Sequence, residues 1–215
     1  MSNAHGPGKG VRPPAPQQNF DTAAKLGFEA VEEQPAEQLL WLGAQPRQYG
    51  WQVPVLNDVL EVDLSAKRVS TSAGQGVRPP WTILTLHYLA ITARPEQQAP
   101  EVTFADLATA RSYAGVYHAR VVARLCATAG RDAQRLGAAA GALGGRSGAQ
   151  AAGDAAFDFS VFPRVSVRLV WHAPDEEFPP SATLLLPENI ESYFCSEDIV
   201  VLSELLVSRL GGGRF

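Results

Sequence analysis

The densest group of acidic residues in this 215-residue chain is Asp175-Glu176-Glu177, which directly precedes Phe178. Two carboxylates can bind a hard cation, or act as acid and base when their surroundings separate their pKa values. Consecutive acids in a turn point in different directions, however, so we favour a solvated turn over a metal site. Alternatively, Glu177 folds inward beside Phe178 and pairs with an arginine.

Tyr113, Tyr117 and Arg120 are separated by four and three residues, a spacing that places them on one face of a helix. Such a face can hold a planar or anionic ligand by stacking and by a bidentate hydrogen bond from the guanidinium group. We favour the alternative, a packing stripe in which the arginine forms a structural ion pair. Arg120 is then the candidate partner of Glu177.

His87 lies within an otherwise apolar stretch, where a neutral imidazole can ligate the metal of a porphyrin or corrin, or act as a general base. One helical turn later the chain has Ala90 and Ile91, so no second ligand follows. We therefore expect a hydrogen-bonded histidine in the core. A catalytic alternative combines His87 with Asp175 or Glu177 in one site.

The two cysteines, Cys126 and Cys195, are 69 positions apart. Zinc and iron–sulfur sites need closely spaced cysteines or four thiolates, so we expect neither site within this chain and leave any other cofactor open. Buried, reduced thiols are the favoured interpretation. Cys195 precedes a predicted helix start, where backbone amides lower the pKa of an exposed thiol.

Hydrophobic residues make up 46% of the chain and charged residues 19%, which suffices for one sizeable core without metals or disulfides. The formal net charge is -4 and there is no long basic stretch, so we expect neither nucleic acid nor a membrane as a partner. No run approaches the roughly 20 apolar residues of a spanning helix, and the first residues lack a signal-peptide core. We expect a soluble, cytoplasmic protein.

Residues 1–18 are rich in Gly, Pro and Gln, and we expect them to form a disordered tail. Residues 19–215 are interpreted as a single α+β domain. Its first elements are two helices, one capped by Asp21 and one opened by Pro35. Over residues 51–69 apolar and polar side chains alternate, which is typical of a small antiparallel sheet.

Two prolines before Trp81 predict the start of a helix that continues to the break at Pro95, and its few polar residues indicate a buried, central position. Two more helices are expected over residues 113–129 and 131–143. The Gly-rich residues 144–153 are then interpreted as a flexible connector.

Alternating patterns return at residues 157–161 and 165–171, and a further strand is expected at 183–186. Ser196 is a good N-cap for a final helix that ends near Leu210. Turns of hairpin length join the strands. The sequence therefore predicts an α+β fold with two groups of antiparallel strands packed with a buried central helix and a C-terminal helix.

Several short motifs occur in a fixed order over residues 81–210. They are Leu86-His87-Tyr88-Leu89, Val102-Thr103-Phe104 followed by Tyr113, Tyr117 and Arg120, Gly153-Asp154, Phe162-Pro163-Arg164-Val165, Trp171, Asp175-Glu176-Glu177-Phe178-Pro179, and Tyr193 with Glu197-Asp198. In their order and spacing these motifs resemble those of the domain of unknown function 3786 family.

The resemblance implies a setting rather than a reaction. Members of that family are common in anaerobes, are sometimes joined to a four-cysteine iron–sulfur segment, and are sometimes encoded near corrinoid-dependent methyl-transfer proteins. A corrinoid or iron–sulfur protein is therefore the implied partner, and because this chain lacks the four cysteines, any electron transfer lies with that partner. The family motifs add two residues to the candidate binding residues, Tyr88 and Trp171.

Three functions follow from these features. The one we favour is a non-catalytic accessory protein that binds a ligand or partner near His87 and the Tyr113–Arg120 helix. The second is an enzyme that uses Asp175, Glu177 or His87 as acid, base or ligand, which requires these groups to converge in one concave site. The third is a structural subunit of a larger complex, which a broad apolar patch without a pocket would favour.

Overall fold

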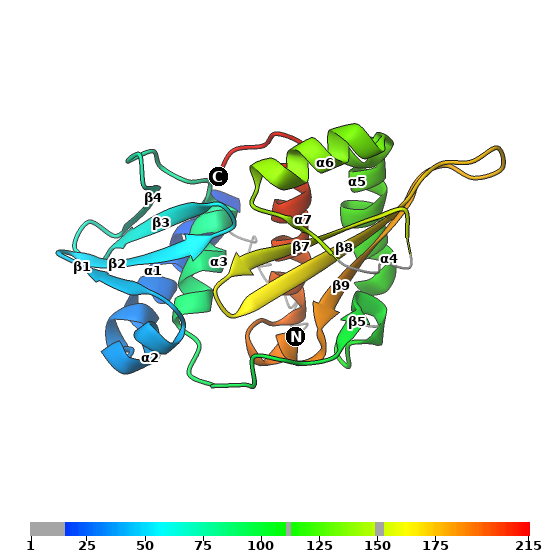
Figure 1. Ribbon diagram of the computed structural model, residues 1–215. Coiled ribbons are helices and arrows are strands. Elements are labelled where there is room, and N and C mark those ends of the chain that lie inside the picture. The colour runs from blue at the N-terminus through cyan, green and yellow to red at the C-terminus, as the bar shows by residue number, and fades with distance from the viewer. Residues whose placement is uncertain (1–15, 111–112, 149–152) are drawn as a thin grey trace, which may run out of the picture.

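The computed structural model describes residues 16–110, 113–148 and 153–215, and the fold of these residues is α+β (Figure 1). All described strand pairs are antiparallel, and they form two sheets. The first sheet has the order β1-β2-β3-β4 and contains β1 (Gln45–Arg47), β2 (Gly50–Val55), β3 (Asp58–Asp63) and β4 (Arg68–Thr71). The second has the order β5-β9-β8-β7-β6 and contains β5 (Glu101–Thr103), β6 (Arg146–Ser147), β7 (Ala155–Phe162), β8 (Val165–His172) and β9 (Ser181–Pro187).

Alternating side chains explain the first sheet. In β2 and β3, Val53 pairs with Leu60, and both side chains are fully buried. Their neighbours along the strands are more exposed, because successive residues of a strand point to opposite faces. A tight turn at Leu56 and Asn57 joins the two strands and sets their register.

The helices are α1 (Pro16–Glu33), α2 (Ala36–Trp41), α3 (Pro79–Leu89), α4 (Ala114–Tyr117), α5 (Ala123–Ala127), α6 (Ala133–Ala142) and α7 (Ser196–Leu210). A π-helical segment, η3 (His118–Val122), makes α4 and α5 one continuous helical rod. Three short 3-10 segments complete the described elements: η1 (Phe104–Asp106), η4 (Ala129–Arg131) and η5 (Glu188–Ser192).

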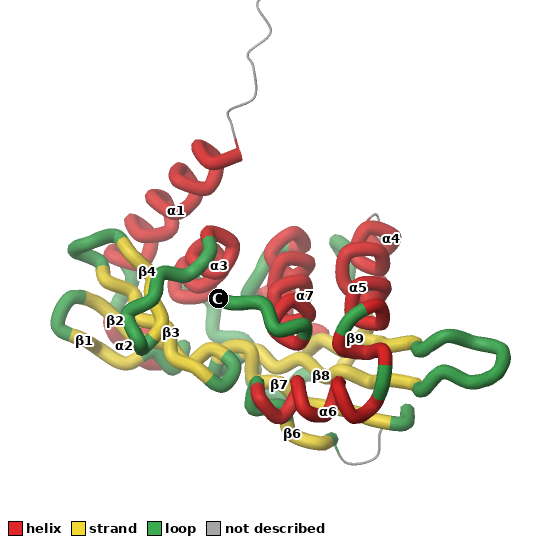
Figure 2. Tube along the Cα trace, turned by 90° about the horizontal axis from the view of Figure 1, so that it is seen from above, coloured by secondary structure: helices red, strands yellow, loops and turns green. Residues whose placement is uncertain are grey.

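Helices α3, α7 and the α4–α5 rod lie side by side on one face of the second sheet (Figure 2). Helix α1 packs on α3 and then extends away from the sheet. Gly27 permits this close packing, because a Cβ atom there would lie 2.8 Å from the Cβ of Leu86. Among the described helices, none combines the length and apolar character needed to cross a bilayer.

Helix α3 is the buried central helix, as predicted. Trp81, Leu84, Leu86, Tyr88 and Leu89 are all fully buried. A single cluster of buried apolar side chains connects this helix with both sheets and with α7. The walls of any site on α3 or α7 are therefore backed by a packed core, which limits their movement.

Helix α1 begins earlier than the sequence pattern indicates. It starts at Pro16, so Asp21 lies inside the helix and does not cap it. The last three residues of the predicted tail belong to this helix, and residues 1–15 lie outside the described part of the chain. A proline is well tolerated in a first helical turn, because the amide it lacks has no partner there.

Two other predicted boundaries also change. Within the predicted connector, Arg146–Ser147 pairs with β7 as an edge strand, while residues 149–152 lie outside the described part. The N-cap of α7 is Cys195, which makes no side-chain capping hydrogen bond, and Ser196 is the first helical residue. The Ser196 hydroxyl lies 2.5 Å from that of Thr109, so it is engaged with another segment.

Candidate functional site

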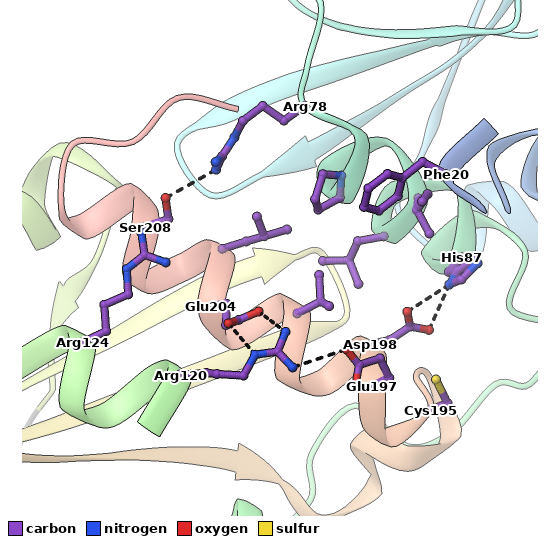
Figure 3. A pocket seen from close by; sticks show the side chains of 15 residues that line it. Phe20, Arg78, His87, Arg120, Arg124, Cys195, Glu197, Asp198, Glu204 and Ser208 are labelled. Atoms are coloured by element: carbon purple, nitrogen blue, oxygen red, sulfur yellow. Dashed lines mark hydrogen bonds and ion pairs between the residues drawn. The ribbon is translucent and has the colours of Figure 1, made fainter. Parts of the chain in front are cut away.

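A groove of about 580 Å³ lies between α3, α7 and the α4–α5 rod, and Phe20 of α1 lines one side of it (Figure 3). Its floor is apolar. The floor side chains come from two helices: Pro80, Ile83 and Leu84 from α3, and Val201 and Leu205 from α7. Ligand sites of proteins are typically concave, of about 300–1,000 Å³, and mainly apolar with a few polar groups.

Helical spacing explains why α7 provides one wall. Glu197, Val201, Glu204 and Ser208 follow one another at intervals of four, three and four residues, and all of them line the groove. Such intervals keep side chains on one stripe of a helix. The remaining apolar side chains of α7, such as the fully buried Leu206, pack into the core and hold this stripe in place.

At one end of the groove, His87 of α3 pairs with Asp198 of α7. The Nδ1 atom of His87 lies 2.9 Å from Oδ2 and 3.0 Å from Oδ1 of Asp198. The side chains are 39% and 16% exposed, respectively. The hydrogen bond with Asp198 raises the pKa of His87, against the opposing effect of burial. The pair joins two walls of the groove and favours a protonated imidazole.

In the middle of the groove, Arg120 of η3 pairs with Glu204 of α7. Nε and Nη2 of Arg120 donate to the two carboxylate oxygens of Glu204, each at 2.7 Å. Nη1 lies 3.6 Å from Oε1 of Glu197. The hydrogen bond with Glu204 raises the pKa of Arg120. This planar, bidentate arrangement leaves little unbalanced charge at Arg120.

The other end of the groove has two arginines, Arg78 before α3 and Arg124 in α5, with Ser208 of α7 near both (Figure 3). Nη2 of Arg78 donates to Oγ of Ser208 at 3.4 Å, a long and therefore weak hydrogen bond. Neither arginine forms an ion pair with any residue that the structure describes. This end therefore has unbalanced positive charge.

Cys195 also lines the groove, near the His87 end, and its side chain is exposed. This outcome contradicts the expectation that both cysteines are buried. Cys126 is half-buried, and burial raises the pKa of its thiol. Within the described ranges, no group of three or more potential metal-ligating side chains is found.

Only part of the predicted Tyr-Tyr-Arg face is present. Tyr117 and Arg120 both face α7, but Tyr117 is buried, donates to Ser203 Oγ at 3.0 Å and stacks on Phe104. Burial raises the pKa of Tyr117 to about 12, so the phenol stays neutral. Tyr113 is exposed and does not line the groove. The π-helical segment η3 begins directly after Tyr117 and contains Arg120, so the simple helical spacing does not hold.

Two candidates from the family motifs are core residues. Tyr88 donates to the carbonyl oxygen of Leu42 at 2.6 Å and stacks on Phe162. Trp171 donates from Nε1 to the carbonyl oxygen of Gly130 at 2.8 Å. Both side chains are buried and neither lines the groove. Their polar atoms connect separate segments, which is a structural role.

Asp175 and Glu177 lie in the loop between β8 and β9, which projects beyond the sheet (Figure 1). Oδ1 of Asp175 accepts hydrogen bonds from the amides of Glu177 and Phe178, at 2.8 and 2.7 Å. The loop is exposed, as the favoured interpretation of a solvated turn states. The alternative that Glu177 folds inward onto Arg120 is wrong, because Arg120 pairs with Glu204. The structure also does not bring either acid to His87.

The surroundings of His87 also differ from the prediction. It forms the expected hydrogen bond, but it lies on the wall of a groove rather than in the core. Its acidic partner is Asp198, which the family motif contains but which we did not select. Glu204, Arg78 and Arg124 were missed as well. The stripe of polar residues on the final helix was the one available signal for Glu204.

Comparison with known proteins matches the chain to a protein family. The family described as Domain of unknown function (DUF3786) matches residues 34–209, which is most of the chain. The match begins well before residue 81, so it includes the first sheet and all the residues that line the groove except Phe20. No curated protein and no solved structure matches.

Proposed function

We propose that this chain, which belongs to the DUF3786 family, is a non-catalytic accessory protein that binds a small amphipathic molecule in the groove. The observation that supports this proposal is a concave site of about 580 Å³ with an apolar floor and polar groups at its margins. Its size lies within the range of small-molecule sites, and its walls are held by a continuous core.

The charged pairs favour binding over turnover. Arg120 is engaged by Glu204, and His87 by Asp198. In covalent catalysis a nucleophile lies within hydrogen-bond reach of its base. Among the described residues, no hydrogen bond joins the thiol of Cys195 to His87. The groove thus offers shape and charge, without an assembled nucleophile and base.

One observation supports an enzyme as the second candidate. Asp198 holds Nδ1 of His87, and an acid in this position orients an imidazole for general base catalysis through Nε2. In such an enzyme the acid that acts together with His87 is Asp198, rather than Asp175 or Glu177. A substrate turned over by the wild-type protein, with the rate lost in His87→Gln, would favour this candidate.

We also propose a corrinoid or iron–sulfur protein as the partner to test first. The support is the family setting alone. The protein would hold the small molecule for that partner, whose cofactor would supply any redox chemistry. Co-purification from an anaerobic extract, followed by absorption spectra of the captured fraction, tests this part separately from ligand binding.

The test of ligand binding uses the full chain purified from its native host without denaturation. Mass spectrometry of the small molecules released on unfolding should identify one compound in stoichiometric amount. Val201→Trp, which places an indole on the floor of the groove, should abolish its retention. Val116→Trp is the matched control, because Val116 is an exposed residue of α4 that does not line the groove.

Thermal unfolding of both variants checks that they are folded. The proposal is contradicted if the wild-type protein retains no compound and binds none from a metabolite extract. It is also contradicted if Val201→Trp is folded and retains the compound as well as the wild type does.

A further inference from the structure

We infer that the ligand of this groove carries an anionic head group, a carboxylate or a phosphate, which binds between Arg78 and Arg124 beside Ser208. The apolar body of the ligand then lies on the floor formed by α3 and α7. This inference rests on the proposed ligand-binding function and adds the chemical class and the orientation of the ligand.

Positive charge is distributed unevenly along the groove. Three arginines line it, and one of them, Arg120, is bound by Glu204 at two points. Arg78 and Arg124 have no acidic partner among the described residues. Guanidinium groups bind carboxylates and phosphates through parallel N–H donors, which an unpaired arginine can direct at a ligand.

Three separate segments converge at the arginine end of the groove. Arg78 precedes α3, Arg124 belongs to α5 and Ser208 to α7, yet all three lie at the same end of the groove (Figure 3). Among the described residues, the one hydrogen bond of the Ser208 hydroxyl is the long contact of 3.4 Å from Arg78. The hydroxyl can therefore donate to an oxygen of the ligand while both arginines contact the same head group.

The order of charges along the groove determines the orientation of the ligand. The three acids that line the groove, Glu197, Asp198 and Glu204, lie toward its middle and its other end. An anionic head group is repelled there and attracted at the arginine end. Along α3, Ile83 lies between Arg78 and His87, and along α7, Val201 lies between Asp198 and Ser208, so these apolar residues separate the two ends. A ligand with a negative charge at one end and an apolar body matches this order of charged and apolar residues along the groove.

The test compares four probes with the same alkyl chain. Dodecanoate and dodecyl phosphate carry the two anionic head groups, dodecanol is neutral, and dodecyltrimethylammonium is cationic. Binding is measured by isothermal titration calorimetry, at probe concentrations below micelle formation. We expect at least one anionic probe to bind. The neutral and cationic probes should bind at least about tenfold more weakly, because a hydrogen bond to a charged group contributes about the binding free energy that a tenfold change in affinity requires. A preference between the two anions distinguishes a carboxylate from a phosphate ligand.

Arginine variants locate the head group. Arg78→Gln and Arg124→Gln should each weaken the anionic probe about tenfold, and the double variant about a hundredfold, with no effect on dodecanol. Arg135→Gln is the matched control, because Arg135 is an exposed residue of α6 that does not line the groove. Glu204→Gln should strengthen anion binding severalfold, because it releases Arg120 from its acidic partner.

The outcomes separate this inference from the proposed function. If the neutral probe binds as tightly as the anions, or if the double arginine variant binds the anion unchanged, the anionic head group is refuted while groove binding stands. If no probe binds and the native protein retains no compound, the proposed function itself fails. A dimer in sedimentation analysis that dissociates in Val201→Trp would show that a second copy occupies the groove, and it would overturn the inference.

Discussion

Asp198→Asn tests whether the His87–Asp198 pair joins α3 to α7 through charge. In the wild type, Asp198 raises the pKa of His87 above its usual value of about 6.5. A pKa that is raised on folding stabilises the protein below the unfolded pKa, and this stabilisation is lost as the pH rises through the folded pKa. Asparagine keeps the size of the side chain and removes the charge. The pH-dependent stabilisation that comes from the His87–Asp198 pair should therefore disappear.

The magnitude follows from the exposure of the two side chains. Fully exposed ion pairs contribute about 0.2–1 kcal/mol, because water and salt screen them. The His87–Asp198 pair is partly buried, with exposed fractions of 39% and 16% and a separation of 2.9 Å, so we expect a value near the upper limit. Asp198→Asn should therefore lower the free energy of unfolding by about 1 kcal/mol at pH 6, and by clearly less at pH 9. In a protein of this size, that corresponds to a Tm lower by about 2–4 °C at pH 6.

Urea denaturation of both proteins at pH 6 and pH 9 measures this difference, and a proton NMR titration of His87 gives its pKa directly. Glu197→Gln is the control, because it removes a neighbouring charge that does not contact His87. Its effect on the free energy of unfolding should be the same at pH 6 and pH 9. The reasoning is refuted if His87 titrates at or below its usual pKa in the wild type. A destabilisation by Asp198→Asn that is equal at pH 6 and pH 9 would also refute it.

Three further experiments test other parts of the structure. A double-mutant cycle with Arg120→Gln and Glu204→Gln, measured by urea denaturation, should give a coupling energy of about 1 kcal/mol. Additive effects of the two substitutions would show that the bidentate pair does not form in solution. Gly43→Ala should destabilise the fold by at least about 1–2 kcal/mol, because Gly43 has a φ of 84° and its new Cβ would lie 2.5 Å from Pro163; an unchanged Tm would contradict this geometry. Asp132→Ala should cost about 1 kcal/mol by thermal unfolding, since its side chain caps α6 through a 2.7 Å hydrogen bond, whereas Asp132→Asn should retain most of the stability.

The elements of this fold were predictable where periodicity is strong. The buried α3, the longer strands β2, β3, β7, β8 and β9, and the final helix α7 follow from patterns of apolar residues within short windows. The start of α1 at Pro16 was not, because its first turn has few apolar residues and the helix is supported by packing on α3. The edge strand at Arg146–Ser147 was missed for a similar reason, since its hydrogen bonds to β7 come from a distant part of the chain.

The groove shows a sharper limit of sequence reasoning. The sequence drew attention to His87 and Arg120, and the structure places both in the groove, but the acidic partners considered for them were not the ones that they have. Exposed acids in a run, such as Glu177, attract attention in a sequence although they are solvated in the structure. Isolated acids on a helix, such as Glu204, attract less attention although they bind an arginine.

The sequence by itself determined which residues are apolar, which helices have one polar stripe, and which family the chain resembles, because these are properties of neighbouring positions. Only the tertiary structure decided which charges meet. His87 and Asp198 are 111 positions apart, and Arg120 and Glu204 are 84 apart. Helical spacing specifies neighbours three or four positions away, and carries no information about such distant pairs. The packing of α3, α7 and the α4–α5 rod on one sheet brings these residues together, and it leaves Arg78 and Arg124 at one end of the groove without an acidic partner among the residues that the structure describes.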